Sequence, residues 1–229
     1  MPLRLFTDKT PWDDVRRDVR YVAAGLTAAD EHIALAKPLR TLLAQWKTIE
    51  SDREDADDAM VDANAVVRRL DITLDRLVND LAGQLLAECG RDTSAPGFRR
   101  FFPEAPSAVI RLGLESEIER TKKFATVAEE IGASKETKAI LKRFDGIHTK
   151  GTAALKAREK VAETQGRVSL RISTWKDDSN HARRSVESAL EKYATDHRLP
   201  RTYADEFFPP GRSTKKDVET APAETPAPK

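Results

Sequence analysis

A long stretch without helix-breaking residues limits what this chain can fold into. From Leu39 to Ala82 there is neither glycine nor proline, and large apolar residues recur at steps of three and four, as in Leu39, Leu42, Trp46 and Ile49. This spacing places them on one stripe of an α-helix and is typical of helices that pack lengthwise in bundles and coiled coils. We therefore predict an all-α fold built from long helices.

The middle of this stretch decides whether it forms one helix or a hairpin. The apolar spacing stays in phase as far as Met60, which favours one continuous helix. However, helices this long are uncommon in globular domains, and Ser51 and Glu54 have the spacing of a capping box. A second long apolar stretch later in the chain contains Gly166. We favour the hairpin, and we expect a kink or a new helix start at Pro38, because proline removes a backbone hydrogen bond.

The chain also repeats itself. The tripeptide Phe-Phe-Pro occurs as Phe101, Phe102 and Pro103 and again as Phe207, Phe208 and Pro209. A shift of 105 residues aligns Val22–Lys37 with Val127–Lys142, with six identical residues. We interpret this as internal duplication into two pseudo-equivalent helical units, 1–105 and 106–211, that pack with pseudo-twofold symmetry. Residues 212–229, rich in proline and alanine, are predicted to be a disordered tail.

The second copy has smaller residues in its apolar stripe. Gly151 and Ser179 stand where the first copy has Trp46 and Leu74. Small residues permit a close approach, and the bulky side chains of the first copy have the size to fill the space. We therefore expect the two copies to pack on each other.

Local signals place the ends of the shorter helices. Thr10 has the features of an N-cap, with Pro11 at the first helical position, and this helix is predicted to run to about Ala24. Gly25 in the first copy and Gly132 in the second mark a break before each long segment.

Charge is distributed unevenly along the chain. The formal net charge is only +1, which provides no general attraction to nucleic acid. Residues 1–105 carry 15 Lys and Arg against 19 Asp and Glu, a net charge of −4, whereas residues 106–211 carry 20 against 16, a net charge of +4. We expect no nucleic-acid partner, and the basic second copy keeps binding to a membrane surface as an alternative.

Two further features indicate the compartment. The beginning of the chain lacks an apolar core of signal-peptide length, and no run of about eighteen apolar residues occurs, so we expect neither a cleaved signal nor a membrane span. The single cysteine, Cys89, cannot form an internal disulfide and is expected to be buried or half-buried. The sequence therefore predicts a cytoplasmic protein.

The Phe-Phe-Pro segments are the candidate partner-binding sites. Paired aromatic residues beside a proline can anchor in the groove of a partner, so Phe101, Phe102 and Pro103 are one candidate. The residues Phe207, Phe208 and Pro209 are the other. The interpretation that we favour is that each segment folds back over the open end of a helical bundle.

Metal binding is a weaker hypothesis. Asp145 with His148 and Asp178 with His181 each place a carboxylate and an imidazole three residues apart on a helix. If the second long segment is a hairpin, the two pairs face each other, as in di-iron helical bundles. We interpret them, and the acidic run Asp52–Asp62, as solvated surface, and we expect no metal and no cofactor.

No catalytic arrangement is found, since the chain has no nucleophile elbow, no His-Glu-x-x-His motif and no glycine-rich phosphate loop. We therefore predict a non-enzymatic interaction or scaffold protein that binds a protein partner or assembles with itself through helical faces. A membrane-surface helical protein and a metal-binding helical bundle are the alternatives.

Overall fold

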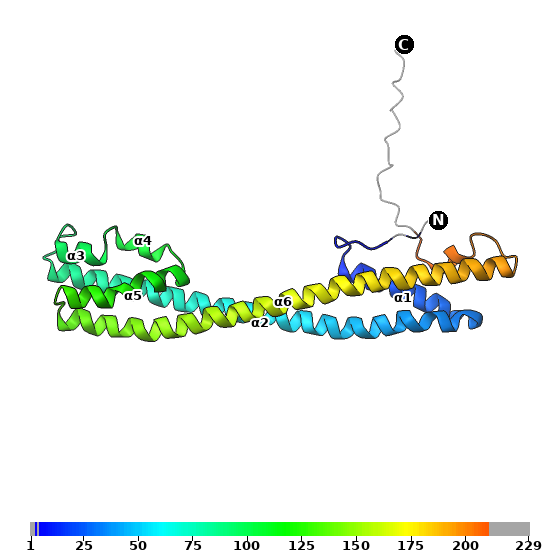
Figure 1. Ribbon diagram of the computed structural model, residues 1–229, viewed down its shortest axis with the longest axis horizontal. Helices are drawn as coiled ribbons and strands as arrows, with labels where there is room; N and C mark the ends of the chain where they lie inside the picture. Colours follow the sequence, from blue (N-terminus) through cyan, green and yellow to red (C-terminus); the bar gives the residue numbers. More distant parts are fainter. Residues whose placement is uncertain (1–2, 4, 211–229) are drawn as a thin grey trace, which may run out of the picture. The chain divides into compact units, whose positions relative to one another are not determined.

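The computed structural model describes residue 3 and residues 5–210, and in this part of the chain it contains helices and no strand (Figure 1). The predicted all-α class is therefore confirmed. The predicted tail, 212–229, lies outside the described residues. The elements in chain order are α1 (Trp12–Ala28), η1 (Asp30–His32), α2 (Ile33–Glu88), α3 (Pro96–Phe101), α4 (Pro106–Ile110), α5 (Leu114–Glu130), α6 (Lys135–Asp196) and η2 (Ala204–Phe207).

Both long segments are single helices, so the preference for a hairpin is wrong. α2 has 56 residues and α6 has 62. In α2 the acidic run is held along the helix by Arg53, which donates hydrogen bonds to the carboxylates of Glu50 and Asp57. Such contacts at spacings of three and four stabilise a continuous helix. α6 passes through Gly166 at a cost of about 1 kcal/mol relative to alanine.

The predicted helix starts and breaks hold only in part. α2 begins at Ile33 and runs through Pro38, so no new helix starts there. The N-cap position of α1 belongs to Pro11, and the Thr10 hydroxyl instead accepts a hydrogen bond from the backbone N–H of Thr7. Gly25 lies inside α1, which continues to Ala28.

The predicted break at Gly132 is confirmed. Gly132 has φ of +64°, in the left-handed region that glycine adopts without strain, and it lies between the end of α5 and the start of α6. The Ser134 hydroxyl then accepts a hydrogen bond from the backbone N–H of Thr137 at 3.0 Å, which caps the first turn of α6.

The chain divides into two compact units, each built from separate parts of the sequence. Unit 1 comprises the described residues up to Thr48 and those from Arg171 onward, and unit 2 comprises Ile49–Leu170. Unit 1 therefore contains α1, η1, the first part of α2, the last part of α6 and η2. Unit 2 contains the remainder of α2 and α6 together with α3, α4 and α5.

Within unit 2, α2 and α6 are antiparallel neighbours. The Gln165 side chain donates a hydrogen bond to Asp57 at 2.9 Å, and Arg143 forms an ion pair with Asp80 at 3.2 Å. In these contacts the residue numbers increase along α2 as they decrease along α6, so the two helices run antiparallel. α5 completes the bundle, and the short helices α3 and α4 contact α5.

The core of unit 1 is organised around its tryptophans. Trp12 stacks on Trp46, with ring centroids 5.8 Å apart, and meets Trp175 edge-on at 4.7 Å. The indole N–H of Trp175 donates to the backbone carbonyl of Leu42 at 2.8 Å. The Arg16 guanidinium lies 4.3 Å from the Trp46 ring centroid. Aromatic contacts and a cation–π contact therefore join α1, α2 and α6 in unit 1.

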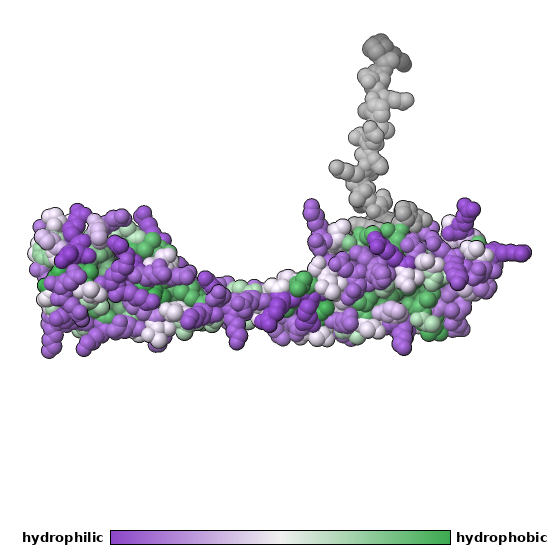
Figure 2. All heavy atoms as spheres, viewed as in Figure 1, coloured by the Kyte–Doolittle hydropathy of each residue, from purple (hydrophilic) through white to green (hydrophobic). Residues whose placement is uncertain are grey.

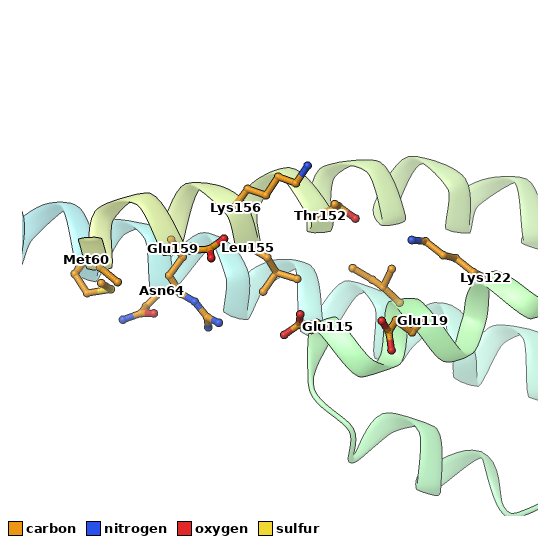
Figure 3. A pocket seen from close by; sticks show the side chains of 12 residues that line it. Met60, Asn64, Glu115, Glu119, Lys122, Thr152, Leu155, Lys156 and Glu159 are labelled. Atoms are coloured by element: carbon orange, nitrogen blue, oxygen red, sulfur yellow. The ribbon is translucent and has the colours of Figure 1, made fainter. Parts of the chain in front are cut away.

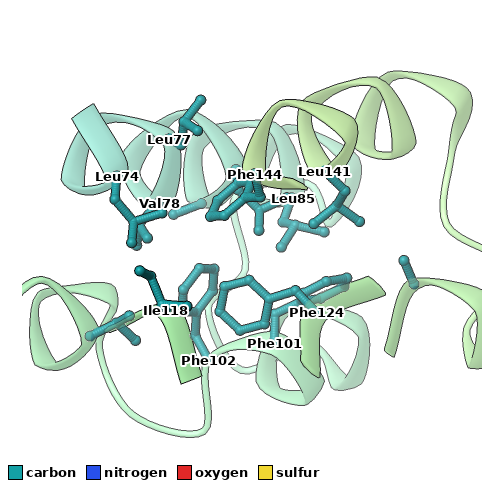
Figure 4. Packing of buried hydrophobic residues seen from close by; sticks show 14 of the residues in the cluster. Leu74, Leu77, Val78, Leu85, Phe101, Phe102, Ile118, Phe124, Leu141 and Phe144 are labelled. Carbon is teal, nitrogen blue, oxygen red and sulfur yellow. The ribbon is translucent and has the colours of Figure 1, made fainter. Parts of the chain in front are cut away.

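The core of unit 2 is built from phenylalanine and leucine (Figure 4). Phe124 of α5 lies among Phe101, Phe102 and Phe144, with ring centroids between 5.3 and 6.2 Å away. Leucines of α2 complete this cluster, including Leu74, Leu77, Leu81 and Leu85. Unit 2 therefore buries the apolar face of α5 against the two long helices and the segment around α3.

Gly151 brings α5 close to α6. A Cβ at this position would lie 2.6 Å from Cδ1 of Ile118 and 3.5 Å from Cδ1 of Leu114. We expected bulky side chains of the first half to fill this space. Instead, residues of α5, from the second half, occupy it.

Charged and polar side chains cover most of the visible surface, and hydrophobic residues are exposed in separate small areas (Figure 2). The most exposed large apolar residues are Leu170 and Val61, at 68% and 67%. Among the described residues, no helix combines the length and the apolarity needed to cross a bilayer.

Candidate interaction surface

The first Phe-Phe-Pro segment is mostly buried. Phe101 and Phe102 are each 1% exposed and contact Phe124 of α5, whereas Pro103 is exposed. A segment from the first half of the sequence therefore covers a helix from the second half.

The second Phe-Phe-Pro segment covers α1. Phe207 is 8% exposed, and its ring contacts Gly25 and lies 5.3 Å from His32. Phe208 and Pro209 are partly exposed, which leaves them with Pro103 as the accessible members of the two segments. Their contact with a partner stays a prediction.

The cover over α1 includes polar aromatic side chains. Nε2 of His32 and the hydroxyl of Tyr203 form a hydrogen bond of 2.8 Å, and the His32 ring also meets Tyr193 edge-on. His32 is 2% exposed, so this hydrogen bond satisfies a buried ring nitrogen.

The two Asp-x-x-His pairs do not come together as a metal site. α6 is continuous, so both pairs lie on one helix, His148 in unit 2 and His181 in unit 1. Asp145, Asp178 and His181 are exposed. The described residues contain no group of three potential ligands suited to a metal ion.

His148 has a structural role instead. It is 8% exposed, and its Nε2 lies 2.8 Å from the Thr121 hydroxyl, which itself donates to the backbone carbonyl of Glu117. The hydroxyl has one proton, so His148 must donate from Nε2. Burial lowers the pKa of His148, and this outweighs Asp145, which acts to raise it.

A small cavity of about 420 Å³ lies at the end of α2, beside Glu88 and Cys89. Burial acts to raise the pKa of Glu88, but hydrogen bonds from Gln84, Ser134 and Thr137 outweigh it and lower that pKa. The Cys89 thiol is partly buried, as expected. Through these hydrogen bonds Glu88 links the end of α2 to the start of α6.

A larger open groove, of about 710 Å³, lies in unit 2 between α2, the first turns of α5 and the middle of α6 (Figure 3). Four of the residues that line it are apolar: Met60, Ile118, Leu155 and Ala162. This is the surface that we call the groove below.

The groove continues the path of α5. Beside Gly151, the surface of α6 is covered by Leu114 and Ile118 of α5. One turn farther along α6 is Leu155, and about two turns beyond it is Ala162, and both line the groove. Figure 3 shows α2 and α6 extending past the beginning of α5. The groove is therefore a place beside two helices where a third helix has room to lie.

Charges of both signs surround the apolar part of the groove. Three carboxylates and three cationic side chains line it: Glu115, Glu119, Glu159, Lys122, Lys156 and Arg158. The groove therefore has no strong bias toward an anionic or a cationic ligand.

Comparison of the chain with protein-family models, with curated proteins and with solved structures finds no match. The groove and the tryptophan cluster were both missed by sequence reasoning. Trp12, Trp46 and Trp175 are not equivalent positions of the repeat, so the repeat could not pair them. The groove depends on where α5 begins relative to α6, which follows from contacts between residues far apart in the sequence.

Proposed function

We propose that this chain is a non-enzymatic helical interaction protein and that its groove binds an amphipathic helix of a protein partner. The observation that supports this most is the groove itself, in which Met60, Leu155 and Ala162 provide an apolar surface beside α2 and α6. Helical segments bind such surfaces with side chains spaced three and four residues apart.

The packing of the neighbouring helix α5 indicates what kind of partner segment fits the groove. Its residues Leu114 and Ile118 pack against Gly151 on the same side of α6 that continues into the groove. A partner helix placed end to end with α5 would contact Leu155 and Ala162 in the same way. The charges around the groove suit a partner helix whose polar face carries both signs, because such a face pairs with carboxylates and cations alike.

We also propose that the chain arose by internal duplication into 1–105 and 106–211. Two facts support this. α1 and α5 have 17 residues each, and each precedes a long helix that is followed by a Phe-Phe-Pro segment. In addition, each Phe-Phe-Pro segment covers the short helix of the other half. A cytoplasmic location remains part of the proposal and is supported by the single free Cys89.

The test of the groove uses two matched substitutions on α6. Ala162→Arg places a long charged side chain in the groove, whereas Ala157→Arg makes the same change at an exposed position that does not line it. We expect proteins cross-linked to the tagged full-length chain in cells to be recovered with the wild type and with Ala157→Arg, and to be lost with Ala162→Arg.

Equal recovery with all three chains would contradict the groove as the binding site. Circular dichroism of both variants serves as the control for folding. If the wild type recovers no protein and sedimentation shows that the purified chain remains a single monomer at all concentrations, the proposal of an interaction protein fails.

A further inference from the structure

A cluster of carboxyl groups lies inside unit 2, where α2 meets α5. Glu117 of α5 is completely buried, with 0% of its surface exposed, and Asp71 and Asp75 of α2 are partly buried. Four of their oxygen atoms are buried without a hydrogen-bond donor among the described residues: Oδ1 of Asp71, Oδ1 of Asp75, and Oε1 and Oε2 of Glu117. We call this the carboxyl cluster.

Arg68 of α2 neutralises the negative charge of the carboxyl cluster only in part. Arg68 forms an ion pair with Oδ2 of Asp71 at 3.1 Å, but its side chain is 72% exposed, so water screens this contact. The fully buried oxygens of Glu117 receive no hydrogen bond from it.

The other elements packed on α5 do not neutralise the cluster either. The imidazole of His148 on α6 is bound to Thr121, and α4 has no titratable residue. Arg99 of α3 donates to the backbone carbonyl of Pro103, and Arg100 pairs with Glu130 at the far end of α5. On α5 itself, the nearest cation in sequence is Arg120, which is partly exposed and is not among the charges that influence Glu117. The next is Lys122, which faces the groove and acts on His148.

Three carboxylates in this position cannot all be ionised without a large cost, because a buried charge without donors loses its hydration and like charges repel. We propose that docking of α5 on α2 is proton-dependent: α5 is held while the carboxyl cluster retains a proton on Glu117 and is released when that proton is lost.

The electrostatics of the cluster support this. Burial raises the pKa of Glu117 to about 8, and repulsion from Asp75 and Asp71 adds to the effect. A hydrogen bond between the side chains of Glu117 and Asp75, which needs a proton on one of the two carboxyl groups, also raises the pKa of Glu117. Burial also raises the pKa of Asp75. A group whose pKa is higher in the folded state contributes its full stability below its unfolded value, which is 4.5 for Glu117, and loses it as the pH rises through 8.

His148 changes stability in the opposite direction and in a different pH range. Its pKa is lowered from 6.5, so its protonation disfavours the folded state only as the pH falls below that value. Above pH 6.5 His148 therefore adds nothing to the pH dependence that the carboxyl cluster gives unit 2.

Release of α5 would also change the groove. Ile118 and Glu119, which line it, directly follow Glu117 in the sequence. This consequence rests on the proposed function, whereas the proton-dependent docking of α5 does not.

The test is hydrogen–deuterium exchange of the full chain between pH 6.5 and 9, corrected for intrinsic exchange rates. We expect the protection of α5 amides to fall about tenfold per pH unit up to about pH 8 and then to level off. In Glu117→Gln the protection of α5 should be independent of pH. Glu129→Gln, at an exposed position of α5 that does not line the groove, should behave as the wild type.

A second variant keeps the test decisive if Glu117→Gln does not fold. Asp75→Asn removes one neighbouring charge and should move the levelling-off point to lower pH. The same pH dependence in Glu117→Gln as in the wild type would overturn the proposal, as would an equal loss of protection in α1 of unit 1. Two results together would also overturn the proposal and indicate a cation site. Millimolar Mg²⁺ or Ca²⁺ would restore the protection of α5 amides at pH 8.5, and their protection in the presence of a chelator would not depend on pH.

Discussion

Unit 1 and unit 2 bury α1 and α5 in different ways, although each combines a 17-residue helix with parts of α2 and α6. In unit 1 two buried aromatic side chains have hydrogen-bonded polar ends, Trp175 with the carbonyl of Leu42 and His32 with Tyr203. The indole nitrogen of Trp46 is buried without a hydrogen-bond partner among the described residues. In unit 2 the buried aromatic residues are phenylalanines and His148, and the buried carboxyl group of Glu117 lies beside two further carboxyl groups, those of Asp71 and Asp75.

This difference shows that two cores of different composition can stabilise the same arrangement of helices. In unit 1 the hydrogen bonds of Trp175, His32 and Tyr203 help to fix one arrangement, because each would leave a buried polar group unpaired if it were broken. Unit 2 depends on the shape of its Phe and Leu side chains, and its buried carboxyl group adds a cost that grows with pH. All three tryptophans lie in unit 1, so tryptophan fluorescence reports on unit 1 alone, whereas circular dichroism reports on both.

The largest expected effect is that of the Phe-Phe-Pro segments. Phe102→Ala empties a site that is 1% exposed and should lower the free energy of unfolding of unit 2 by about 3–5 kcal/mol. Phe208→Ala, at a partly exposed position of unit 1, should cost only about 1 kcal/mol. Denaturant unfolding followed by circular dichroism measures both, and equal costs would show that the two segments are equivalent.

A smaller effect is expected for the tryptophan cluster of unit 1. Trp175→Phe removes the donor to the Leu42 carbonyl and part of the contact with Trp12, so unit 1 should lose about 1–2 kcal/mol of stability. The fluorescence of the two remaining tryptophans should change at lower denaturant concentration, while exchange of α5 amides in unit 2 stays as in the wild type. An unchanged fluorescence midpoint would argue against this cluster.

The smallest expected effects come from two glycines of α6 in unit 2. Gly151→Ala should destabilise unit 2 by about 1 kcal/mol, because the new Cβ would lie 2.6 Å from Ile118 and the overlap exceeds the gain in helix propensity. Gly166→Ala has open space around its Cβ and should stabilise by about 1 kcal/mol. A change in melting temperature of the same sign for both variants would contradict the close approach of α5 to α6.

The sequence was sufficient for the helical class and for part of the local structure. The spacing of Leu39, Leu42 and Trp46 predicted a helix, and Gly132 predicted a break, because both signals act within a few residues. The hairpin was wrong because Ser51 and Glu54 were interpreted as a cap, whereas Arg53 bridges the acidic residues along one helix.

The candidate site was harder to predict than the fold. The groove, the carboxyl cluster and the tryptophan cluster each join residues far apart in the sequence, and their assembly depends on which helix turns meet. Glu117 has no distinguishing feature in the sequence, since a glutamate on a charged helix is usually exposed. Only the packing of α5 against α2 reveals that it is buried.

The most direct test of the account is whether each unit needs both halves of the chain. A protease site inserted between Pro103 and Pro106, outside the helices, allows the folded chain to be cut into two fragments. We predict that the fragments remain together at the mass of the intact chain in native buffer and separate only in denaturant, because unit 1 and unit 2 each contain parts of both. Separation of two folded fragments in native buffer would contradict this account.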